Sequence, residues 1–190
     1  MNTKQIMIVG VGGQGTLLSS KILGRVLLDS GYDVKVSEVH GMSQRGGSVV
    51  TYVRFGDKVY SPVIDKGEAD VILSFEKLEA ARWLEYLKEG GKMIVNTYEA
   101  MPMPVITGAA QYPDDLINKM KAKGADVEAD DFLSIATAAG SSKAVNIALL
   151  GRLSKSFPEI SEESWINAIT AIVPPKFLEL NKKAFELGRK

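Results

Sequence analysis

The residues best suited to chemistry lie near the start of the sequence. Gly10, Gly12 and Gly15 follow an apolar run with the spacing G-x-G-x-x-G, and helically spaced apolar residues begin after Thr16. In a strand–turn–helix unit such glycines allow a tight turn, close approach of a ligand to the backbone, and close packing of helix on strand. The first helical N–H groups then face a space suited to a phosphate or another anion. Close packing alone would explain the same glycines, so both interpretations remain open. The candidate cofactor-binding residues are Gly10, Gly12, Gly13, Gln14, Gly15 and Thr16.

A second polar segment follows the next predicted strand. It offers an imidazole, a hydroxyl, an amide and a guanidinium within a few residues, flanked by glycines. Ligands gather at this end of a strand in open α/β sheets. Arg45 can bind a carboxylate or phosphate through two parallel hydrogen bonds, although a surface salt bridge is its ordinary alternative. The candidate substrate- or partner-facing residues are Glu38, His40, Ser43, Gln44, Arg45, Gly46 and Gly47.

Two further polar residues have positions that need an explanation. Glu38 comes about 20 residues after the glycine loop, where an acidic residue accepts hydrogen bonds from a ribose in dinucleotide-binding folds. A solvated carboxylate, or one paired with Arg45, is the alternative. Asn146 lies in an apolar helical run, and a buried amide is expected to find a hydrogen-bond partner.

The sequence lacks most catalytic equipment. It has no cysteine and one histidine, which excludes disulfides, thiolate catalysis, a cysteine-ligated iron–sulfur cluster and a His-rich metal site in this chain. No serine lies in a nucleophile-elbow context. We therefore assign no catalytic residue and no metal ligand, and we expect one subunit of a larger enzyme.

Composition narrows the class of protein further. The 190 residues are 45% hydrophobic and carry 23 basic and 23 acidic side chains. Such a chain can bury a sizeable core, and its balanced charge predicts no nucleic-acid or membrane-surface binding. No apolar run reaches the roughly 18 residues of a membrane span, and no signal-peptide pattern is present. We expect a cytoplasmic protein.

Strand and helix patterns alternate along the first two thirds of the chain. They predict an α/β fold with a three-layer, Rossmann-like, mostly parallel sheet, helices on both faces and a helical C-terminal region. We expect one domain over residues 1–190, with an α/β core at 1–129 and a helical part at 130–190. The expected strands are 5–9, 33–39, 48–55, 69–75, 92–96 and 125–129, with a hairpin strand at 59–61 and an extended segment at 101–105. The expected helices are 16–30, 76–88, 112–123, 130–139, 142–157, 162–172 and 174–187.

Three segments together resemble a known family. Residues 9–15 have the sequence Val-Gly-Val-Gly-Gly-Gln-Gly, residues 38–48 Glu-Val-His-Gly-Met-Ser-Gln-Arg-Gly-Gly-Ser, and residues 144–151 Ala-Val-Asn-Ile-Ala-Leu-Leu-Gly. The combination resembles the gamma-type domain of the 2-oxoacid:ferredoxin oxidoreductases, and within that family the small subunits of the indolepyruvate branch. The resemblance extends over essentially the whole chain.

The resemblance implies a function for the chain in a complex. It implies oxidative decarboxylation of an aryl 2-oxoacid such as indolepyruvate with coenzyme A, which gives an aryl-acetyl-coenzyme A, carbon dioxide and reduced ferredoxin in anaerobic metabolism. Thiamine diphosphate and iron–sulfur clusters are then expected on a large catalytic (alpha) subunit. The small subunit would be inactive alone. The glycine loop would hold a phosphate-bearing group, and the segment from His40 to Arg45 would face the partner or the substrate.

Two other functions fit the residues. A free-standing, Rossmann-type NAD-dependent oxidoreductase would use the glycine loop and Glu38. A non-catalytic subunit could bind a nucleotide through the glycine loop without taking part in the reaction. A purely structural or regulatory partner would bind no small molecule.

Overall fold

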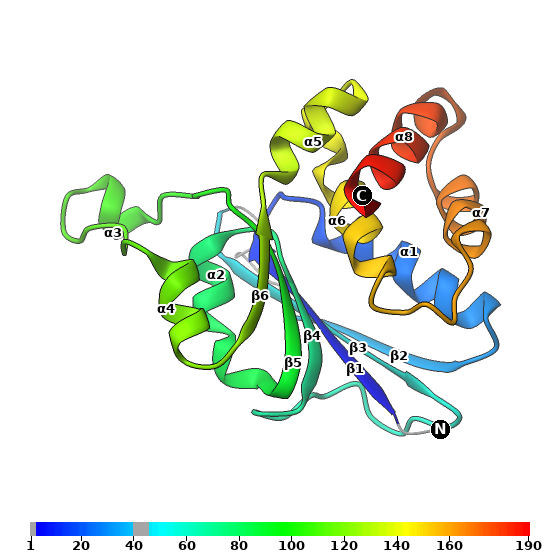
Figure 1. Cartoon of the computed structure of the whole chain (residues 1–190), viewed down its shortest axis with the longest axis horizontal. Helices are drawn as coiled ribbons and strands as arrows, with labels where there is room; N and C mark the ends of the chain where they lie inside the picture. Colours follow the sequence, from blue (N-terminus) through cyan, green and yellow to red (C-terminus); the bar gives the residue numbers. More distant parts are fainter. Residues whose placement is uncertain (1–2, 40–45) are drawn as a thin grey trace.

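A six-stranded sheet organises the part of the chain that the computed structural model describes, residues 3–39 and 46–190. The strand order is β2-β3-β1-β4-β5-β6 (Figure 1). Strands β1, β4, β5 and β6 pair in parallel, whereas β3 is antiparallel to both β1 and β2. The strands are β1 (Lys4–Val11), β2 (Asp33–Val39), β3 (Ser48–Gly56), β4 (Ala69–Ser74), β5 (Leu87–Asn96) and β6 (Asp126–Asp130).

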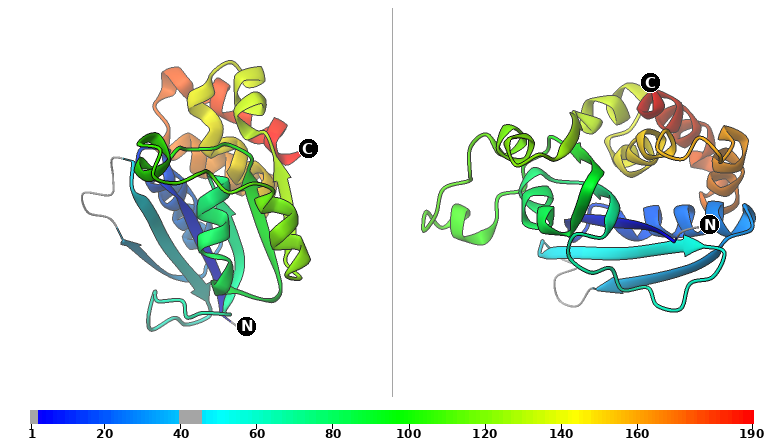
Figure 2. Two further views of the ribbon diagram at one scale, coloured as in Figure 1. Left: turned by 90° about the vertical axis from the view of Figure 1, so that its left-hand side faces the viewer. Right: turned by 60° about the horizontal axis from the view of Figure 1, so that its bottom comes forward.

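Helices cover both faces of the sheet, as the sequence predicts (Figure 2). Side chains of a strand alternate between faces, so β1 directs Ile6 and Ile8 into one core and Met7 and Val9 into the other. The first core packs under α1 (Thr16–Asp29), α5 (Phe132–Ala139), α6 (Val145–Ser154), α7 (Glu162–Ile172) and α8 (Leu178–Arg189). The second packs under α2 (Lys77–Arg82) and α4 (Leu116–Ala122).

Helices α6 and α8 pack backbone to backbone. A Cβ built on Gly188 would lie 2.6 Å from the carbonyl carbon of Ala148 and nearer still to its oxygen. From the other helix, a Cβ on Gly151 would lie 3.0 Å from the Arg189 nitrogen and closer to the Phe185 oxygen. Such contacts leave no room for a side chain at either glycine. They fix the position of α6, whose first turn lies beside the glycine loop.

The predicted helix at 76–88 is wrong in its second half. Helix α2 ends at Arg82, a short 3₁₀ turn spans Leu84–Tyr86, and β5 begins at Leu87. Leu87 pairs with Ala69 of β4, and the register then shifts before Val71. Pairing with an existing strand has overridden the local helical pattern, which is the usual way tertiary contacts defeat propensity.

Two other predicted elements also differ. The hairpin strand at 59–61 does not form; a loop there is held by Val59 N–H donating to Asp33 Oδ2 (2.9 Å) and by Arg54 donating to the Val63 oxygen (2.9 Å). The extended segment at 101–105 contains a short helix, α3 (Met103–Ile106), whose proline lies in the first turn, where it costs no hydrogen bond.

The described residues limit two kinds of site. None of the helices in this part of the chain has the length and apolar composition that crossing a bilayer requires. No group of acidic and histidine side chains within residues 3–39 and 46–190 is arranged to hold a metal ion.

Candidate functional site

The glycine loop joins the carboxyl end of β1 to α1, and the side chain of Gln14 holds it in shape. The Gln14 Oε1 accepts a hydrogen bond from Val11 N–H (2.7 Å), and its Nε2 donates to the Phe75 oxygen (3.3 Å). A Cβ on Gly10 would lie 2.9 Å from both Gln14 Oε1 and Phe75 Cβ. Gly10 is thus required for packing, and Gln14 shapes the loop from inside.

Several backbone N–H groups of the loop have no acceptor among the described residues. They belong to Gly13, Gly15, Thr16 and Leu17. Helix α1 has no side-chain cap and no acidic residue in its first turn, so the positive end of its dipole is not neutralised locally. Gly13 and Gly15 have φ of 102° and 91°, left-handed values that glycine adopts without strain. This arrangement suits an anion.

The second polar segment meets the glycine loop through the backbone. Gly12 N–H donates to the Gly47 oxygen (2.8 Å), and Gly46 N–H donates to the Gly12 oxygen (3.2 Å). These bonds continue the β1–β3 ladder beyond the pair Val11–Ser48. The predicted residues Gly46 and Gly47 are therefore next to the loop. His40, Ser43, Gln44 and Arg45 lie outside the described residues.

Glu38 lies beside the start of α1. The buried Ser20 hydroxyl donates to Glu38 Oε1 (2.7 Å), and Glu38 lines a pocket of about 280 Å³ with Gly12, Gly13 and Thr16. Because β3 separates β2 from β1, this carboxylate is one strand further from the glycine loop than in the dinucleotide-binding strand order. A ribose-binding role for Glu38 stays a prediction.

A larger pocket, of about 610 Å³, adjoins the same loop. Gly13 and Gly15 line both pockets. The larger one combines apolar walls with polar groups, and it lies where β4 and β5 end and α6 begins. Its lining includes Leu18, Phe75, Tyr98, Leu133, Lys143 and Asn146.

Asn146 is the exceptional residue of this pocket. The residue is 5% exposed, and its amide makes no hydrogen bond with any described residue. The expected protein partner is therefore absent. A Cβ on Gly15 would lie 3.2 Å from Asn146 Nδ2, so the amide lies directly against the glycine loop. The amide atoms are not fully enclosed by protein, because the amide borders the pocket, so a bound ligand can hydrogen-bond to it in place of water.

Two buried glutamates support the region from α2. Glu79 accepts hydrogen bonds from Ser48, directly after the second polar segment, and lies 3.3 Å from Arg82. Burial raises the pKa of the Glu79 carboxyl above its usual range. Glu76 accepts from Glu79 N–H (2.8 Å) and from the Tyr112 hydroxyl. Burial and the Glu76 carboxylate together raise the pKa of Tyr112.

The candidate set from the sequence omitted most of the lining of the larger pocket, including Tyr98, Lys143 and Asn146. Asn146 is at the start of a helix after a glycine-serine break, and Tyr98 follows a strand end. Such positions, at a helix start and after a strand end, could have identified both residues as candidate site residues from the sequence. What the sequence does not reveal is that both places meet the loop at Gly15.

Comparison with known proteins defines the class. Residues 5–190 match the family model described as pyruvate ferredoxin/flavodoxin oxidoreductase, and the chain belongs to this family. Over its whole length it is 46% identical to the indolepyruvate oxidoreductase subunit IorB of Thermococcus kodakarensis, covering 96% of that protein. It is 38% identical to the IorB subunit of Archaeoglobus fulgidus, over 96% of this chain and 92% of that one.

Solved structures share the fold. Subunit PORC of the Thermotoga maritima pyruvate oxidoreductase has a TM-score of 0.78 at 21% identity, covering 100% of this chain and 96% of that one. A 2-oxoglutarate:ferredoxin oxidoreductase from Magnetococcus marinus has a TM-score of 0.75 at 21% identity; all of this chain matches 31% of that chain. These comparisons identify the chain as a small subunit of a 2-oxoacid oxidoreductase. They do not support the free-standing NAD-dependent enzyme.

Proposed function

We propose that the chain is the small subunit of an indolepyruvate-type 2-oxoacid:ferredoxin oxidoreductase and that it holds the phosphate-bearing part of coenzyme A. Full-length identity of 46% and 44% to two IorB subunits supports the substrate class. The observation that carries the binding role is the meeting, at one pocket, of the glycine loop before an uncapped helix and the Asn146 amide, which makes no hydrogen bond with a described residue.

Each part of the pocket has a role in this proposal. The N–H groups of Gly13 and Gly15, which line this pocket, donate to phosphate oxygens, where the helix dipole favours negative charge. A Cβ on Gly13 would meet nothing within 4 Å, so the loop surface is open to a ligand there. Lys143 adds a positive charge, and Phe75 supplies an apolar wall for a ring.

The redox chemistry is assigned to the large subunit. This chain has no cysteine, so it does not fit an iron–sulfur cluster, whose usual ligands are thiolates. Thiamine diphosphate, when bound to the large subunit, supplies the stabilised carbanion for decarboxylation. The small subunit binds and orients the acyl acceptor, and electrons leave through the large subunit toward ferredoxin.

Kinetics of the reconstituted complex test the binding role. We expect Asn146→Ala to raise the KM for coenzyme A about fivefold to a hundredfold, because one buried hydrogen bond is lost. Lys143→Ala should raise it as well and make it less dependent on salt. The KM for indolepyruvate should not change in either variant.

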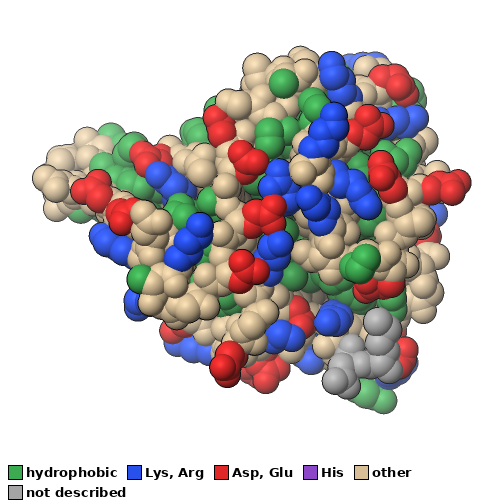
Figure 3. Space-filling view, viewed as in Figure 1, with side chains coloured by type: hydrophobic (Ala, Val, Ile, Leu, Met, Phe, Trp, Pro, Cys, Tyr) green, Lys and Arg blue, Asp and Glu red, His purple; other side chains and the backbone are tan. Residues whose placement is uncertain are grey.

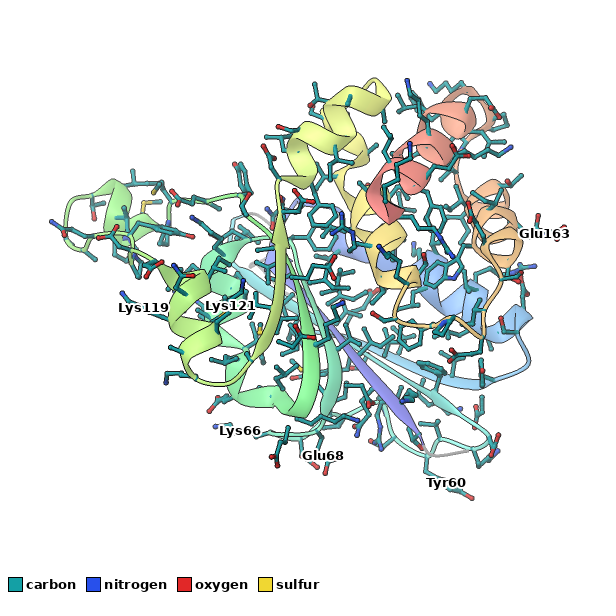
Figure 4. The ribbon with its side chains drawn as sticks, viewed as in Figure 1. Tyr60, Lys66, Glu68, Lys119, Lys121 and Glu163 are labelled. Atoms are coloured by element: carbon teal, nitrogen blue, oxygen red, sulfur yellow. The ribbon has the colours of Figure 1, made fainter. Side chains whose placement is uncertain are left out.

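The matched control is Lys66→Ala, which removes a lysine at the opposite end of the sheet (Figure 4). It should leave all constants unchanged. An unchanged KM for coenzyme A in both Asn146→Ala and Lys143→Ala would refute the phosphate site. The subunit assignment is tested separately, by copurification of the chain with its large subunit.

A further inference from the structure

Residues 98–112 form a projection that we call the arm. It leaves the carboxyl end of β5, extends away from the sheet, carries α3 at its tip and returns toward α4 (Figures 1 and 2). No residue of the arm is buried. The fold itself therefore gains little apolar burial from it.

The arm is nevertheless a built structure. Both of its ends are attached to one carboxylate, because Glu76 accepts hydrogen bonds from Ala100 N–H (3.2 Å) and from the Tyr112 hydroxyl. Glu76 is 1% exposed. Within the arm, Thr107 N–H donates to the Met103 oxygen (2.9 Å). A segment fixed in this way can present a defined surface at a low entropic cost.

Apart from Glu99, which pairs with Lys77, the surface of the arm is uncharged and largely apolar. No acidic or basic residue occurs between Glu99 and Asp114. Met103 is 67% exposed and Ile106 is 65% exposed, with Met101 also exposed beside them. Hydrophobic side chains gather on the projecting part in Figure 3. A contiguous exposed apolar patch marks an interaction site, and methionine adapts well to an irregular apolar groove.

We propose that the arm docks this chain on the large catalytic subunit by inserting Met103 and Ile106 into an apolar groove that carries no charge. This inference rests on the proposed function, because that function supplies the large subunit. Such a groove is complementary to the uncharged residues 100–112, since a charged partner surface would lose hydration against them without gaining an ion pair.

Two observations favour the large subunit over a second copy of this chain. In the Magnetococcus marinus enzyme this fold matches only 31% of a longer chain, so there it is part of a larger polypeptide. In addition, Tyr98 at the root of the arm lines the 610 Å³ pocket. A partner held by the arm therefore lies beside the pocket that we assign to the phosphate-bearing part of coenzyme A, from which the thiol has to extend to the partner to receive the acyl group.

Copurification with the large subunit tests the docking surface. The variant carries Met103→Glu and Ile106→Glu, and it is coexpressed with the large subunit and purified through a tag on this chain. Burying two charges without partners should weaken association about a hundredfold or more. A second variant, Met103→Ser with Ile106→Ser, removes apolar area without adding charge and should weaken association less.

The control carries Tyr60→Glu and Val63→Glu, two exposed apolar residues in the loop between β3 and β4. Tyr60 lies at the end of the sheet away from the arm (Figure 4). It adds the same charge and should copurify like the wild type. All variants should unfold in urea like the wild-type chain, because none of these side chains is buried.

Three outcomes would overturn the proposal. The glutamate variant could copurify at the wild-type level. The isolated chain could form a dimer that the arm variants dissociate, which would assign the arm to a second copy. The wild-type chain could fail to bind any large subunit, which would refute the proposed function as well. If instead the arm variants lose the partner while Asn146→Ala leaves the KM for coenzyme A unchanged, the arm stands and the phosphate site fails.

Discussion

The substitution Gly188→Ala sets two physical effects of opposite sign against each other. Alanine is favoured over glycine inside a helix by about 1 kcal/mol, so local preference predicts stabilisation of α8. The new Cβ, however, would lie 2.6 Å from the Ala148 carbonyl carbon and 2.7 Å from its Cα. These are backbone atoms of α6 that cannot rotate away, so the two helices have to separate.

The magnitude follows from these contacts. Overpacking costs about 1–3 kcal/mol and occasionally more, and a contact with backbone belongs at the upper end of that range. After the helical preference is subtracted, we expect Gly188→Ala to lower the free energy of unfolding by about 2 kcal/mol. Helix α6 also positions Asn146 against Gly15, so the KM for coenzyme A of the complex should rise in parallel.

The matched control is Gly24→Ala. Gly24 is also buried inside a helix, α1, but the nearest atom to its built Cβ is Val36 Cγ2 at 3.8 Å, an ordinary contact. This variant should be more stable than the wild type by about 0.5–1 kcal/mol. Urea unfolding of the isolated chain measures both changes. If Gly188→Ala is as stable as Gly24→Ala, the close packing of α6 on α8 is refuted.

Three further predictions concern charged groups. Burial raises the pKa of Glu128, but hydrogen bonds from Lys92 (2.7 Å) and Arg152 (2.5 Å) outweigh burial and lower the pKa overall. The ionised Glu128 carboxylate therefore stabilises the folded chain above about pH 4.5, and this stabilisation is lost as the pH falls. Glu128→Gln should therefore be less stable than the wild type at pH 7 and approach it near pH 3 in urea unfolding. Burial raises the pKa of Glu79, so the ionised carboxylate destabilises the folded wild-type chain as the pH rises above about 4.5. Glu79→Gln should therefore gain stability relative to the wild type as the pH rises; a parallel pH profile would contradict this. Arg45→Ala should raise the KM for indolepyruvate or coenzyme A about tenfold or more in the complex; unchanged kinetics would remove Arg45 from the site.

The sequence predicted secondary structure best where residue types and hydrophobic spacing indicate the same element. Strand β2 was predicted with its observed bounds, and the glycines predicted the turn into α1 at Thr16. The direction of β3 was not predictable, because an alternating strand has the same pattern whether it runs parallel or antiparallel to its neighbour. The insertion of β3 between β1 and β2 moved Glu38 one strand away from its expected place.

The pocket was less predictable than the fold. Its lining residues come from segments far apart in the chain, near Gly15, Tyr98 and Asn146. The sequence identified Asn146 as a buried amide but could not show that no protein group satisfies it. It also could not distinguish whether Gln14 contacts a ligand or holds the loop, since both need the same amide. The distances to Val11 and Phe75 show that Gln14 holds the loop; its contact with a ligand stays a prediction, since it also lines the larger pocket.

The order of translation gives the α6–α8 contact a further consequence. The glycine loop leaves the ribosome early, but α6 is held in place by Gly188 of α8, which is translated much later. A nascent chain that has emerged only through α7 would contain the loop and Asn146, but not the helix that holds α6 against the loop. Coenzyme A should therefore be unable to protect such a ribosome-bound fragment from proteolysis, and maturation of the complex should follow synthesis of α8.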